Sequence, residues 1–165
     1  MSFKIRAITH LELPIITSLS AQIWPMAYKD IITQEQIQYM LKNMYSQQAL
    51  EQNILDGHTF LIAESEGKAL GYAGYQLNFP QLEFCKLHKL YVLPKLHQTG
   101  IGSALFNEVI TQIKANHCCH MLLQVNKNNP ALQFYQNKGM YIHEEAVFDI
   151  GNGFVMDDYI MRLDC

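Results

Sequence analysis

The order of hydrophobic and polar positions along the chain predicts an alternation of strands and helices. Apolar side chains recur every second residue in some segments, as in half-buried strands, and every third or fourth residue in others, as in amphipathic helices. Strand-like alternation or short apolar runs occur at residues 3–8, 59–64, 69–77, 83–93, 122–125, 141–150 and 154–163. Helical spacing occurs at residues 11–23, 33–44, 47–55, 101–113 and 130–138.

Several short segments are typical of element ends. Residues 33–36, Thr-Gln-Glu-Gln, resemble a capping box, and the glycines in residues 66–68 and 151–153 are typical of hairpin turns. Pro25 is expected to interrupt the first helix directly after Trp24, because proline lacks the amide that a helix interior needs. The resulting order of elements predicts an α/β fold with a mixed sheet.

Composition restricts the class of protein. The 165 residues are 49% hydrophobic and 16% charged, which argues against disorder and suffices for the core of a single domain over residues 1–165. The net charge of −3 and the lack of a Lys/Arg-rich run argue against a nucleic-acid partner. No apolar run approaches the roughly 20 residues of a membrane span, and the N-terminus does not resemble a signal peptide. We therefore expect a cytoplasmic protein with no membrane contact.

Cysteine and histidine positions do not predict a metal site. The four cysteines form no evident disulfide framework, and without a secretory signal we expect them to be reduced. Residues 117–120, His-Cys-Cys-His, are the one candidate metal cluster. Adjacent residues of a strand point to opposite faces, so these four side chains could not easily converge on one ion. We expect a helix end and a strand entry there instead.

Residues 87–105 carry the strongest functional signal. The apolar run that is closed by Pro94 predicts a strand, and Gly100 and Gly102 lie where the next helix begins. The first N–H groups of a helix lack intrahelical partners, and glycine lets a ligand approach the backbone closely. This unit therefore predicts the binding of a phosphorylated ligand. It lacks the third glycine of a dinucleotide fingerprint and the Gly-Lys-Ser/Thr ending of a P-loop.

A second motif downstream makes the first one specific. The motif residues are, in chain order, Leu90, Tyr91, Val92, Gly100, Gly102, Asn128, Ala131, Tyr135 and Gly139. Together they resemble the GNAT superfamily of acetyl-coenzyme A (acetyl-CoA) dependent N-acetyltransferases, closely over residues 87–140 and more loosely elsewhere. The resemblance implies a single-domain α/β fold with a mixed, mostly antiparallel sheet of six to seven strands and about four flanking helices. It also implies that two central strands splay apart to admit the pantetheine arm.

The resemblance implies acetyl-CoA as the cosubstrate and a set of residues that bind it. The strand backbone is expected to pair with the pantetheine amides at Leu90, Tyr91 and Val92. The helix start is expected to hold the pyrophosphate, mainly through the backbone, at His97, Gln98, Thr99, Gly100, Ile101, Gly102 and Ser103. His97 stands where the family usually has Arg or Gln, so we expect weaker, more pH-dependent binding. Asn128 is expected to orient a cofactor or substrate group, with helix capping by Asn128 or Asn129 as the alternative.

Tyr135 is the predicted general acid. A tyrosine hydroxyl stays protonated at neutral pH and can donate to the thiolate that leaves the thioester. Many relatives carry a glutamate as the base where this chain has Lys86. Glu83 and His88 are the nearest replacements. Strand alternation gives His88 the same face as Lys86 and Leu90, where it either serves as the base or faces solvent. A water-mediated route is the further alternative.

Candidate acceptor-binding residues lie in the first two helices and the last two strands. They are Trp24, Tyr28, Asp157 and Asp158. Aromatic rings beside carboxylates suit a cationic amine, and these segments loosely resemble polyamine-type members of the family. The alternative is that the aromatic residues belong to the core and the aspartates to a solvated edge.

The sequence thus favours an enzyme that passes acetyl directly from acetyl-CoA to a primary amine of a small molecule or a protein. It would need neither a metal nor a covalent intermediate, and Cys85 is expected to be a buried thiol. The alternative is a non-catalytic acyl-CoA sensor or interaction module. A nucleotide-binding protein is a third hypothesis, but the acidic ribose contact is missing. A homodimer is expected because relatives often pair through terminal strands.

Overall fold

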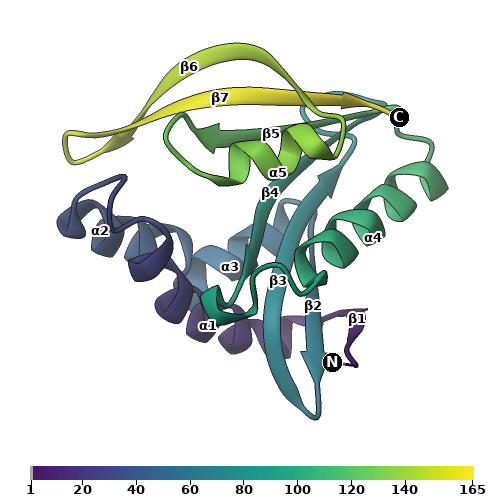
Figure 1. Cartoon of the computed structure of the whole chain (residues 1–165), viewed down its shortest axis with the longest axis horizontal. Helices are drawn as coiled ribbons and strands as arrows, with labels where there is room; N and C mark the ends of the chain where they lie inside the picture. The colour runs from purple at the N-terminus through teal and green to yellow at the C-terminus, as the bar shows by residue number, and fades with distance from the viewer. Residues whose placement is uncertain (1) are drawn as a thin grey trace.

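Seven strands of the computed structural model, which describes residues 2–165, form one mixed sheet in the order β1-β2-β3-β4-β5-β7-β6 (Figure 1). The strands are β1 (Lys4–Ala7), β2 (His58–Ser65), β3 (Lys68–Leu77), β4 (Phe84–Val92), β5 (His120–Asn126), β6 (Tyr141–Gly151) and β7 (Phe154–Asp164). Neighbouring strands are antiparallel, except that β4 and β5 are parallel. The predicted α/β fold with a mostly antiparallel sheet is confirmed.

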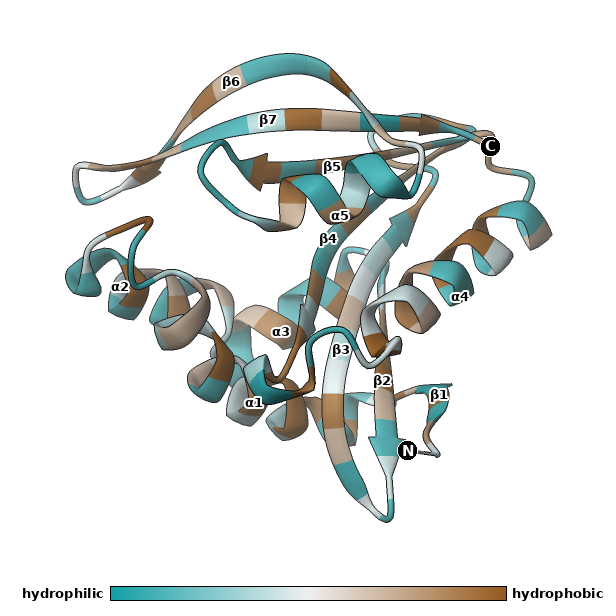
Figure 2. Cartoon of the chain, in the orientation of Figure 1, coloured by the Kyte–Doolittle hydropathy of each residue, from teal (hydrophilic) through white to brown (hydrophobic). Residues whose placement is uncertain are grey.

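Five α-helices in the described part of the chain cover the two faces of the sheet. They are α1 (Leu13–Ala27), α2 (Gln34–Met44), α3 (Gln47–Leu55), α4 (Ile101–Ala115) and α5 (Ala131–Asn137). The first three lie on one face, and α4 and α5 lie on the other (Figure 1). Hydrophobic and hydrophilic residues alternate along helices and strands (Figure 2), and each face buries its own apolar core.

Side-chain caps explain where α2 and α3 begin. The hydroxyl of Thr33 accepts a hydrogen bond from the N–H of Gln36 (3.1 Å), and that of Ser46 accepts one from the N–H of Ala49 (3.1 Å). The Gln36 side chain does not return to Thr33, as a full capping box requires. Its Nε2 donates to the carbonyl of Val155 instead (2.8 Å). This bond ties α2 to β7.

The prediction that Pro25 interrupts the first helix is wrong. α1 continues to Ala27, and the N–H of Tyr28 still donates to the carbonyl of Trp24 (3.0 Å). Proline removes only its own N–H from the helix, and here less than one further turn of the helix remains. The continued turn stacks Tyr28 on Trp24, with ring centroids 4.3 Å apart.

A β-bulge in β4 changes which side chains share a face. Gly74 of β3 pairs with Lys89, whereas Tyr75 pairs with Leu87, so His88 is the extra residue between them. Two successive residues of a regular strand point to opposite faces. The extra residue cancels that alternation, and both His88 and Lys89 line the face that α1, α2 and α3 cover.

The bulge reverses the face pattern in the second half of β4. Leu90 packs against the core on the α4 side, while Lys86, His88 and Tyr91 lie on the opposite face. The expectation that His88 shares a face with Lys86 therefore holds. The expectation that it shares one with Leu90 is wrong, because it assumed an unbroken strand.

The two central strands separate after a short paired segment. Residues 84–86 of β4 pair in parallel with residues 120–122 of β5, and the register ends there. Beyond that point β5 continues to pair with β7, and β4 continues to pair with β3. The rest of β4 has an unpaired edge facing β5, which confirms the expected splay.

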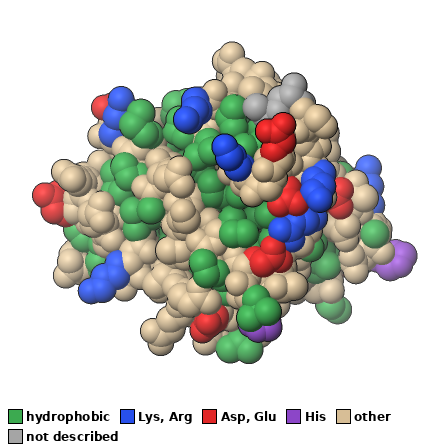
Figure 3. Space-filling model, turned by 90° about the horizontal axis from the view of Figure 1, so that it is seen from below, with side chains coloured by type: hydrophobic (Ala, Val, Ile, Leu, Met, Phe, Trp, Pro, Cys, Tyr) green, Lys and Arg blue, Asp and Glu red, His purple; other side chains and the backbone are tan. Residues whose placement is uncertain are grey.

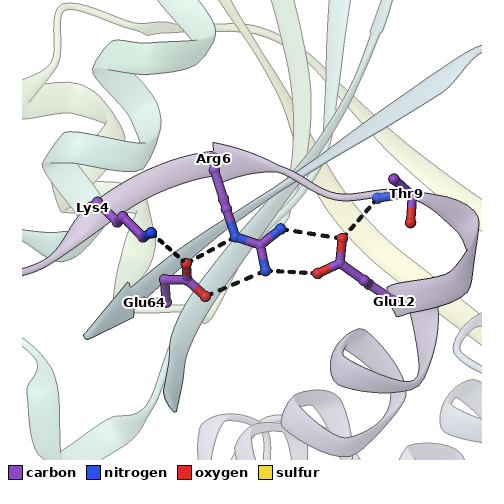
Figure 4. Close-up of polar contacts among 5 residues, drawn as sticks. All are labelled: Lys4, Arg6, Thr9, Glu12 and Glu64. Atoms are coloured by element: carbon purple, nitrogen blue, oxygen red, sulfur yellow. Dashed lines mark hydrogen bonds and ion pairs between the residues drawn. The ribbon is translucent and has the colours of Figure 1, made fainter. Parts of the chain in front are cut away.

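An ion-pair network fastens the N-terminal segment to the sheet (Figure 4). Arg6 Nε lies 2.9 Å from Glu64 Oε1, and Arg6 Nη2 lies 2.6 Å from Glu12 Oε2. Glu12 Oε1 also accepts the N–H of Thr9 (3.2 Å), and Lys4 Nζ lies 3.3 Å from Glu64 Oε1. Exposed pairs contribute little to stability individually. The network mainly fixes the direction of the chain between β1 and α1.

The surface carries charges of both signs. Positive and negative side chains are interspersed over the face that Figure 3 shows from below. None of the helices in residues 2–165 is long and apolar enough to cross a membrane.

Candidate active site

The start of α4 has the geometry of an anion-binding site. Gly100 precedes the helix with a φ of 88°, a conformation that residues with a Cβ adopt only with strain. The first intrahelical bond runs from the N–H of Ala104 to the carbonyl of Gly100 (3.0 Å). The N–H groups of residues 101–103 therefore precede the helical hydrogen-bond pattern and can bind a ligand.

Gly102 leaves room beside these N–H groups. A Cβ placed there would lie 3.7 Å from the side chain of Val92 and 3.8 Å from that of Phe134, which are ordinary contact distances. The fold itself would thus accept a larger residue at this position. Open space, unpaired N–H groups and the positive end of the helix dipole together fit a pyrophosphate.

The loop before α4 brings the remaining predicted cofactor residues to the same place. Gln98 has a φ of 65°, and the hydroxyl of Thr99 donates to the carbonyl of Leu96, which turns the chain into the helix. The side chain of Ile101 is fully buried in the core, so only its backbone is available, as the sequence predicts. Ser103 lies partly buried in the first helical turn.

The unpaired edge of β4 borders this helix start. The N–H of Leu93 donates to the carbonyl of Leu70 (3.0 Å), so strand alternation directs the backbone groups of Leu90 and Val92 toward the gap with β5. His97 Nε2 donates to the carbonyl of Val92 (3.1 Å). The His97 side chain therefore contacts the strand edge predicted to bind pantetheine.

Tyr135 lies on α5 and belongs to the apolar core on the α4 side of the sheet. Its side chain is only 8% exposed, and its ring packs against Phe134 and Phe106, with centroids 5.3 and 6.4 Å away. Burial raises the pKa of the Tyr135 hydroxyl above its ordinary value. The hydroxyl therefore stays protonated at neutral pH, as a proton donor must.

The two asparagines before α5 have different roles. Asn129 Oδ1 accepts the N–H of Ala131 (2.9 Å) and caps the helix. Asn128 is exposed, and its own N–H donates to Asn126 Oδ1 (2.9 Å). Helix capping thus belongs to Asn129, and the Asn128 side chain is left free for the predicted orienting role.

A cavity of about 400 Å³ lies on the α1–α2 side of the splayed strands. Residues of α1, α2 and four strands line it, and the volume is that of a small-ligand site. Its wall includes Trp24, Tyr28 and Tyr91, together with the polar side chains Gln36, Lys86, His88, Lys89, Gln124, Asn126, Asp149 and Asp158.

Asp158 is the most unusual group in this cavity. It is 1% exposed, and neither carboxylate oxygen has a hydrogen-bond partner among the described residues. Burial raises its pKa to about 6, repulsion from Asp157 adds to the shift, and attraction to Lys86 opposes it. A buried carboxylate without a partner is costly for the fold. The charge is therefore suited to a ligand that supplies the missing donor.

Two lysines line the same cavity. Lys86 Nζ donates to Gln124 Oε1 (2.6 Å). Lys89 is 7% exposed; its Nζ donates to Asn53 Oδ1 (3.2 Å) and lies 5.2 Å from the centroid of the Tyr45 ring. Burial lowers the pKa of both lysines, that of Lys89 to about 8.

His88 is at the cavity but is a weak base. Its ring stacks on His58 with centroids 4.0 Å apart, and its Nε2 lies 3.0 Å from Gln76 Oε1. Burial, repulsion from His58 and repulsion from the two lysines lower the pKa of His88 to about 2. Burial likewise lowers the pKa of His58 to about 4. Both rings are neutral at pH 7, and the proton affinity of His88 is too low for an efficient general base.

Trp24 and Tyr28 belong both to the cavity wall and to an aromatic cluster. The Tyr28 hydroxyl lies 2.8 Å from that of Tyr91, and Trp24 packs against Tyr28, Tyr45 and Tyr91. Burial raises the pKa of Tyr28 to about 12, although the hydrogen bond with Tyr91 opposes the shift. Trp24 and Tyr28 thus pack in the core as the alternative expected, and because they also line the cavity their acceptor role stays a prediction.

Two of the residues predicted to act as the base or to bind the acceptor lie outside the cavity. Glu83 is exposed before β4 with a φ of 69°, and its backbone carbonyl binds the N–H groups of Cys119 and His120. Asp157 lies on the opposite face of β7 from Asp158 and pairs with Lys127 (3.0 Å). Neither Glu83 nor Asp157 lines the cavity, and the geometry gives no support to their predicted roles.

Sequence reasoning did not assign Lys86, Lys89 or Gln124 to the acceptor site. Lys89 lies in a strand that is otherwise largely apolar on both sides of His88, which is the one available signal of a buried cation. Its face depends on the bulge at His88, which no local pattern predicts. Gln124 is an ordinary polar strand residue, and no local pattern predicts that it lines the cavity and accepts a hydrogen bond from Lys86.

Comparisons with known proteins agree on one family. The sequence model of the acetyltransferase (GNAT) family matches residues 23–140. The chain is 28% identical over 148 residues to an uncharacterized N-acetyltransferase of Mycobacterium tuberculosis, which spans 88% of this chain and 93% of the relative. It is 23% identical over 163 residues to the spermidine N(1)-acetyltransferase of Thermoplasma acidophilum, spanning 95% and 97%.

A solved structure shows the same fold over the whole length. The PaiA N-acetyltransferase of Thermoplasma acidophilum, crystallised with coenzyme A, superposes with a TM-score of 0.81 at 21% identity and covers 100% of both chains.

Proposed function

Since the chain belongs to the GNAT family of acetyltransferases, we propose that it transfers acetyl from acetyl-CoA directly to a primary amine of a small molecule or a protein. The splay of β4 from β5 carries this proposal, because it connects the helix start at Gly100 with the cavity at Asp158. The two substrates can then meet in the opening between the strands while they occupy opposite faces of the sheet.

The residues on the α4 side fit coenzyme A. The N–H groups of residues 101–103 and the space beside Gly102 would hold the pyrophosphate. The N–H and carbonyl of Leu90 and the N–H of Val92 would pair with the pantetheine amides, as an added strand does. His97 already binds the Val92 carbonyl, so it acts on the pantetheine edge rather than as a long clamp on the phosphates.

The groups around the opening supply the proton transfers. The amine nitrogen attacks the thioester carbonyl, so that a C–N bond forms and the C–S bond breaks. Asp158, ionised above about pH 6, attracts the ammonium form, which first loses one proton to solvent. Asp158 accepts the second proton as the C–N bond forms, and it later releases that proton to solvent. Tyr135 donates a proton to the departing sulfur and regains one from solvent. The products are the N-acetylated amine and the free thiol of coenzyme A.

Binding and turnover test the proposal in sequence. Calorimetric titration should show saturable binding of acetyl-CoA, and no comparable binding of NAD or ATP. Thiol release is then measured with a panel of primary amines. Failure to bind acetyl-CoA, or a preference for NAD or ATP, would contradict the assignment of the helix start at Gly100.

A non-catalytic acyl-CoA sensor is the competing function. It would need the helix start but neither a proton donor nor a proton acceptor at the opening. The unpartnered Asp158 favours the enzyme, because its carboxylate is buried at a cost that a sensor has no reason to bear. Saturable acetyl-CoA binding without thiol release for any amine would favour the sensor.

We also propose a cytoplasmic homodimer. β6 is the last strand of the sheet order, and its side chains Ile142 and Val147 are exposed although they are apolar. Such an edge is a common pairing surface. Light scattering of the purified chain should give about twice the monomer mass, and a monomer mass at micromolar concentration would contradict this expectation.

A further inference from the structure

The bulge in β4 gives the acceptor cavity two cations as well as one anion. Lys86 and Lys89 are three residues apart, and in a regular strand they would point to opposite faces. His88 is the extra residue, so both lysines line the cavity that Asp158 also lines. Asp149 is the other carboxylate of the wall, but it is exposed, and its Oδ1 accepts the N–H of Gly151 (2.8 Å).

Lys89 has no anionic partner among the described residues. Its Nζ has one amide oxygen, that of Asn53, and the faces of the Tyr45 and Phe60 rings at 5.2 and 5.8 Å. A lysine ammonium has three N–H donors, and only one of them is used here. Lys86 also repels Lys89 rather than compensating its charge. The buried ammonium is therefore left with unused donors and an uncompensated charge.

We propose that the acceptor is an amine that also carries an anionic group, a carboxylate or a phosphate, which binds between Lys86 and Lys89. This inference rests on the proposed acetyltransferase function. The acceptor nitrogen would lie at Asp158, and the anionic group would lie at the two lysines. One bound molecule would then compensate the buried charges of Asp158 and Lys89 and the partly buried charge of Lys86, since its ammonium faces the carboxylate and its anion faces the ammonium groups.

The same charges disfavour a polyamine. A second or third ammonium group of the acceptor that lay near Lys86 or Lys89 would be repelled strongly, because like charges meet there at short range in a partly desolvated site. Polyamines are therefore the competing acceptor class, and they are included in the test. A purely structural role of Lys89, bound to Asn53, is the other competing explanation.

The test compares acceptors that differ only in the anionic group. The probes are β-alanine, 4-aminobutyrate and 5-aminovalerate, each matched with the alkylamine of the same chain length, plus 2-aminoethyl phosphate and spermidine. Each is titrated calorimetrically onto the protein saturated with coenzyme A, and thiol release from acetyl-CoA is measured in parallel. At least one carboxylate or phosphate probe should bind about tenfold or more tightly than its matched alkylamine. The chain length that binds most tightly measures the distance between the amine subsite and the anion subsite. The affinity of 2-aminoethyl phosphate relative to the carboxylate probes shows which of the two anions the site prefers.

Variants identify the residues responsible. Lys89→Met keeps the side-chain length and removes the charge, and it should abolish the preference for anionic probes. Lys86→Met should reduce it. Lys68→Met removes a lysine of the exposed β2–β3 hairpin and should leave it unchanged. A structural role of Lys89 would change thermal stability but not the ratio of affinities between matched probes.

The outcomes separate this inference from the function on which it rests. Equal affinity for matched probes, tighter binding of spermidine, or a preference that survives Lys89→Met would overturn the anionic acceptor. If amines still release thiol in that case, the acetyltransferase function stands. Preferential binding of anionic probes without thiol release would contradict the function and leave the anion subsite in place. A protein that neither binds nor acetylates any probe would overturn both.

Discussion

Asp158 shows at the scale of one residue how function opposes stability. Its carboxylate is buried without a hydrogen-bond partner, in a wall that could accommodate a neutral amide of the same shape. In the proposed function, the amine ligand and not the fold would complete its hydrogen bonds. Two predictions follow, one for the rate and one for the free energy of unfolding.

Replacing Asp158 with Asn should lower kcat/KM by roughly a hundredfold or more, the usual contribution of a positioned general base. In the wild type, the reaction requires a deprotonated Asp158 and a deprotonated amine, and at low pH both groups are protonated. The logarithm of kcat/KM should therefore rise with a slope near 2 below about pH 6 and near 1 above it. Asp158→Asn should keep only the slope of 1. Asp157→Asn is the matched control, and an unchanged bend in Asp158→Asn would exclude Asp158 as the base.

The same substitution should stabilise the protein above pH 6. The pKa of Asp158 is about 6 in the folded state against 3.8 ordinarily, so the folded state holds the proton more tightly than the unfolded state does. The free energy of unfolding therefore falls as pH rises from about 4 to about 6. Asp158→Asn avoids this loss, worth about 1–3 kcal/mol, at pH 7.5 but gains little at pH 4. Urea unfolding at both values measures it, and an equal effect at both would contradict the titration.

Tyr135→Phe removes one oxygen from a buried ring. We expect kcat to fall about a hundredfold or more, because the leaving thiolate loses its proton donor. Acetyl-CoA affinity and the melting temperature should change little. Tyr141→Phe, at an exposed tyrosine on β6, controls for general effects of the substitution. A Tyr135→Phe enzyme with unchanged kcat would show that the thiolate leaves without this donor.

At the scale of elements, the sequence predicted nearly every strand and helix, because each buries one face and therefore repeats with the period of its structure. The errors lie where tertiary contacts override the local rule. α1 passes through Pro25 because the missing N–H falls near its end. β4 contains a bulge at His88, and a pattern of alternate residues cannot show an extra one. That single residue decides that Lys89 lines the acceptor cavity.

The cofactor side of the candidate site could be predicted from the sequence better than the acceptor side. The cofactor side follows from glycines and backbone groups, and a helix start can be predicted from local sequence. On the acceptor side, Asp157 and Asp158 were indistinguishable as neighbours in the sequence. The register of β7 with β5 and β6 decides which of them faces inward. Side chains brought together from four strands and two helices leave no local signal.

The start of α4 gives a prediction that separates ligand binding from folding. Gly102→Ala adds a Cβ that meets its protein neighbours at ordinary contact distances. Alanine also favours a helix over glycine by up to about 1 kcal/mol, so the melting temperature of the free protein should stay the same or rise. The added methyl group occupies the space assigned to the pyrophosphate, and acetyl-CoA affinity should fall at least tenfold. Unchanged affinity would mean that the pyrophosphate binds elsewhere.

At the scale of the whole molecule, the sheet separates two faces, and the gap between β4 and β5 connects them. The cofactor elements belong to the α4 face, and the acceptor cavity belongs to the α1–α2 face (Figure 1). The two faces communicate where residues after 86 of β4 and after 122 of β5 are unpaired. An acetyl group at the opening is then within reach of an amine on the far side, and no carrier residue is needed between them.

This arrangement predicts sequential kinetics. Both substrates must be bound before either product leaves, so initial rates at varied acetyl-CoA and amine should give intersecting reciprocal plots rather than the parallel plots of a ping-pong enzyme.

Cys85 is the cysteine of β4, next to the residue where pairing with β5 ends. Its side chain is fully buried in the core on the α4 side, and burial raises its pKa to about 12. It lacks both the thiolate and the access that an acyl carrier requires. Cys85→Ala should therefore keep kcat within about threefold, although loss of the buried sulfur lowers stability by roughly 1 kcal/mol. Parallel plots, or an acetylated protein detected by mass spectrometry after incubation with acetyl-CoA alone, would contradict direct transfer through the opening.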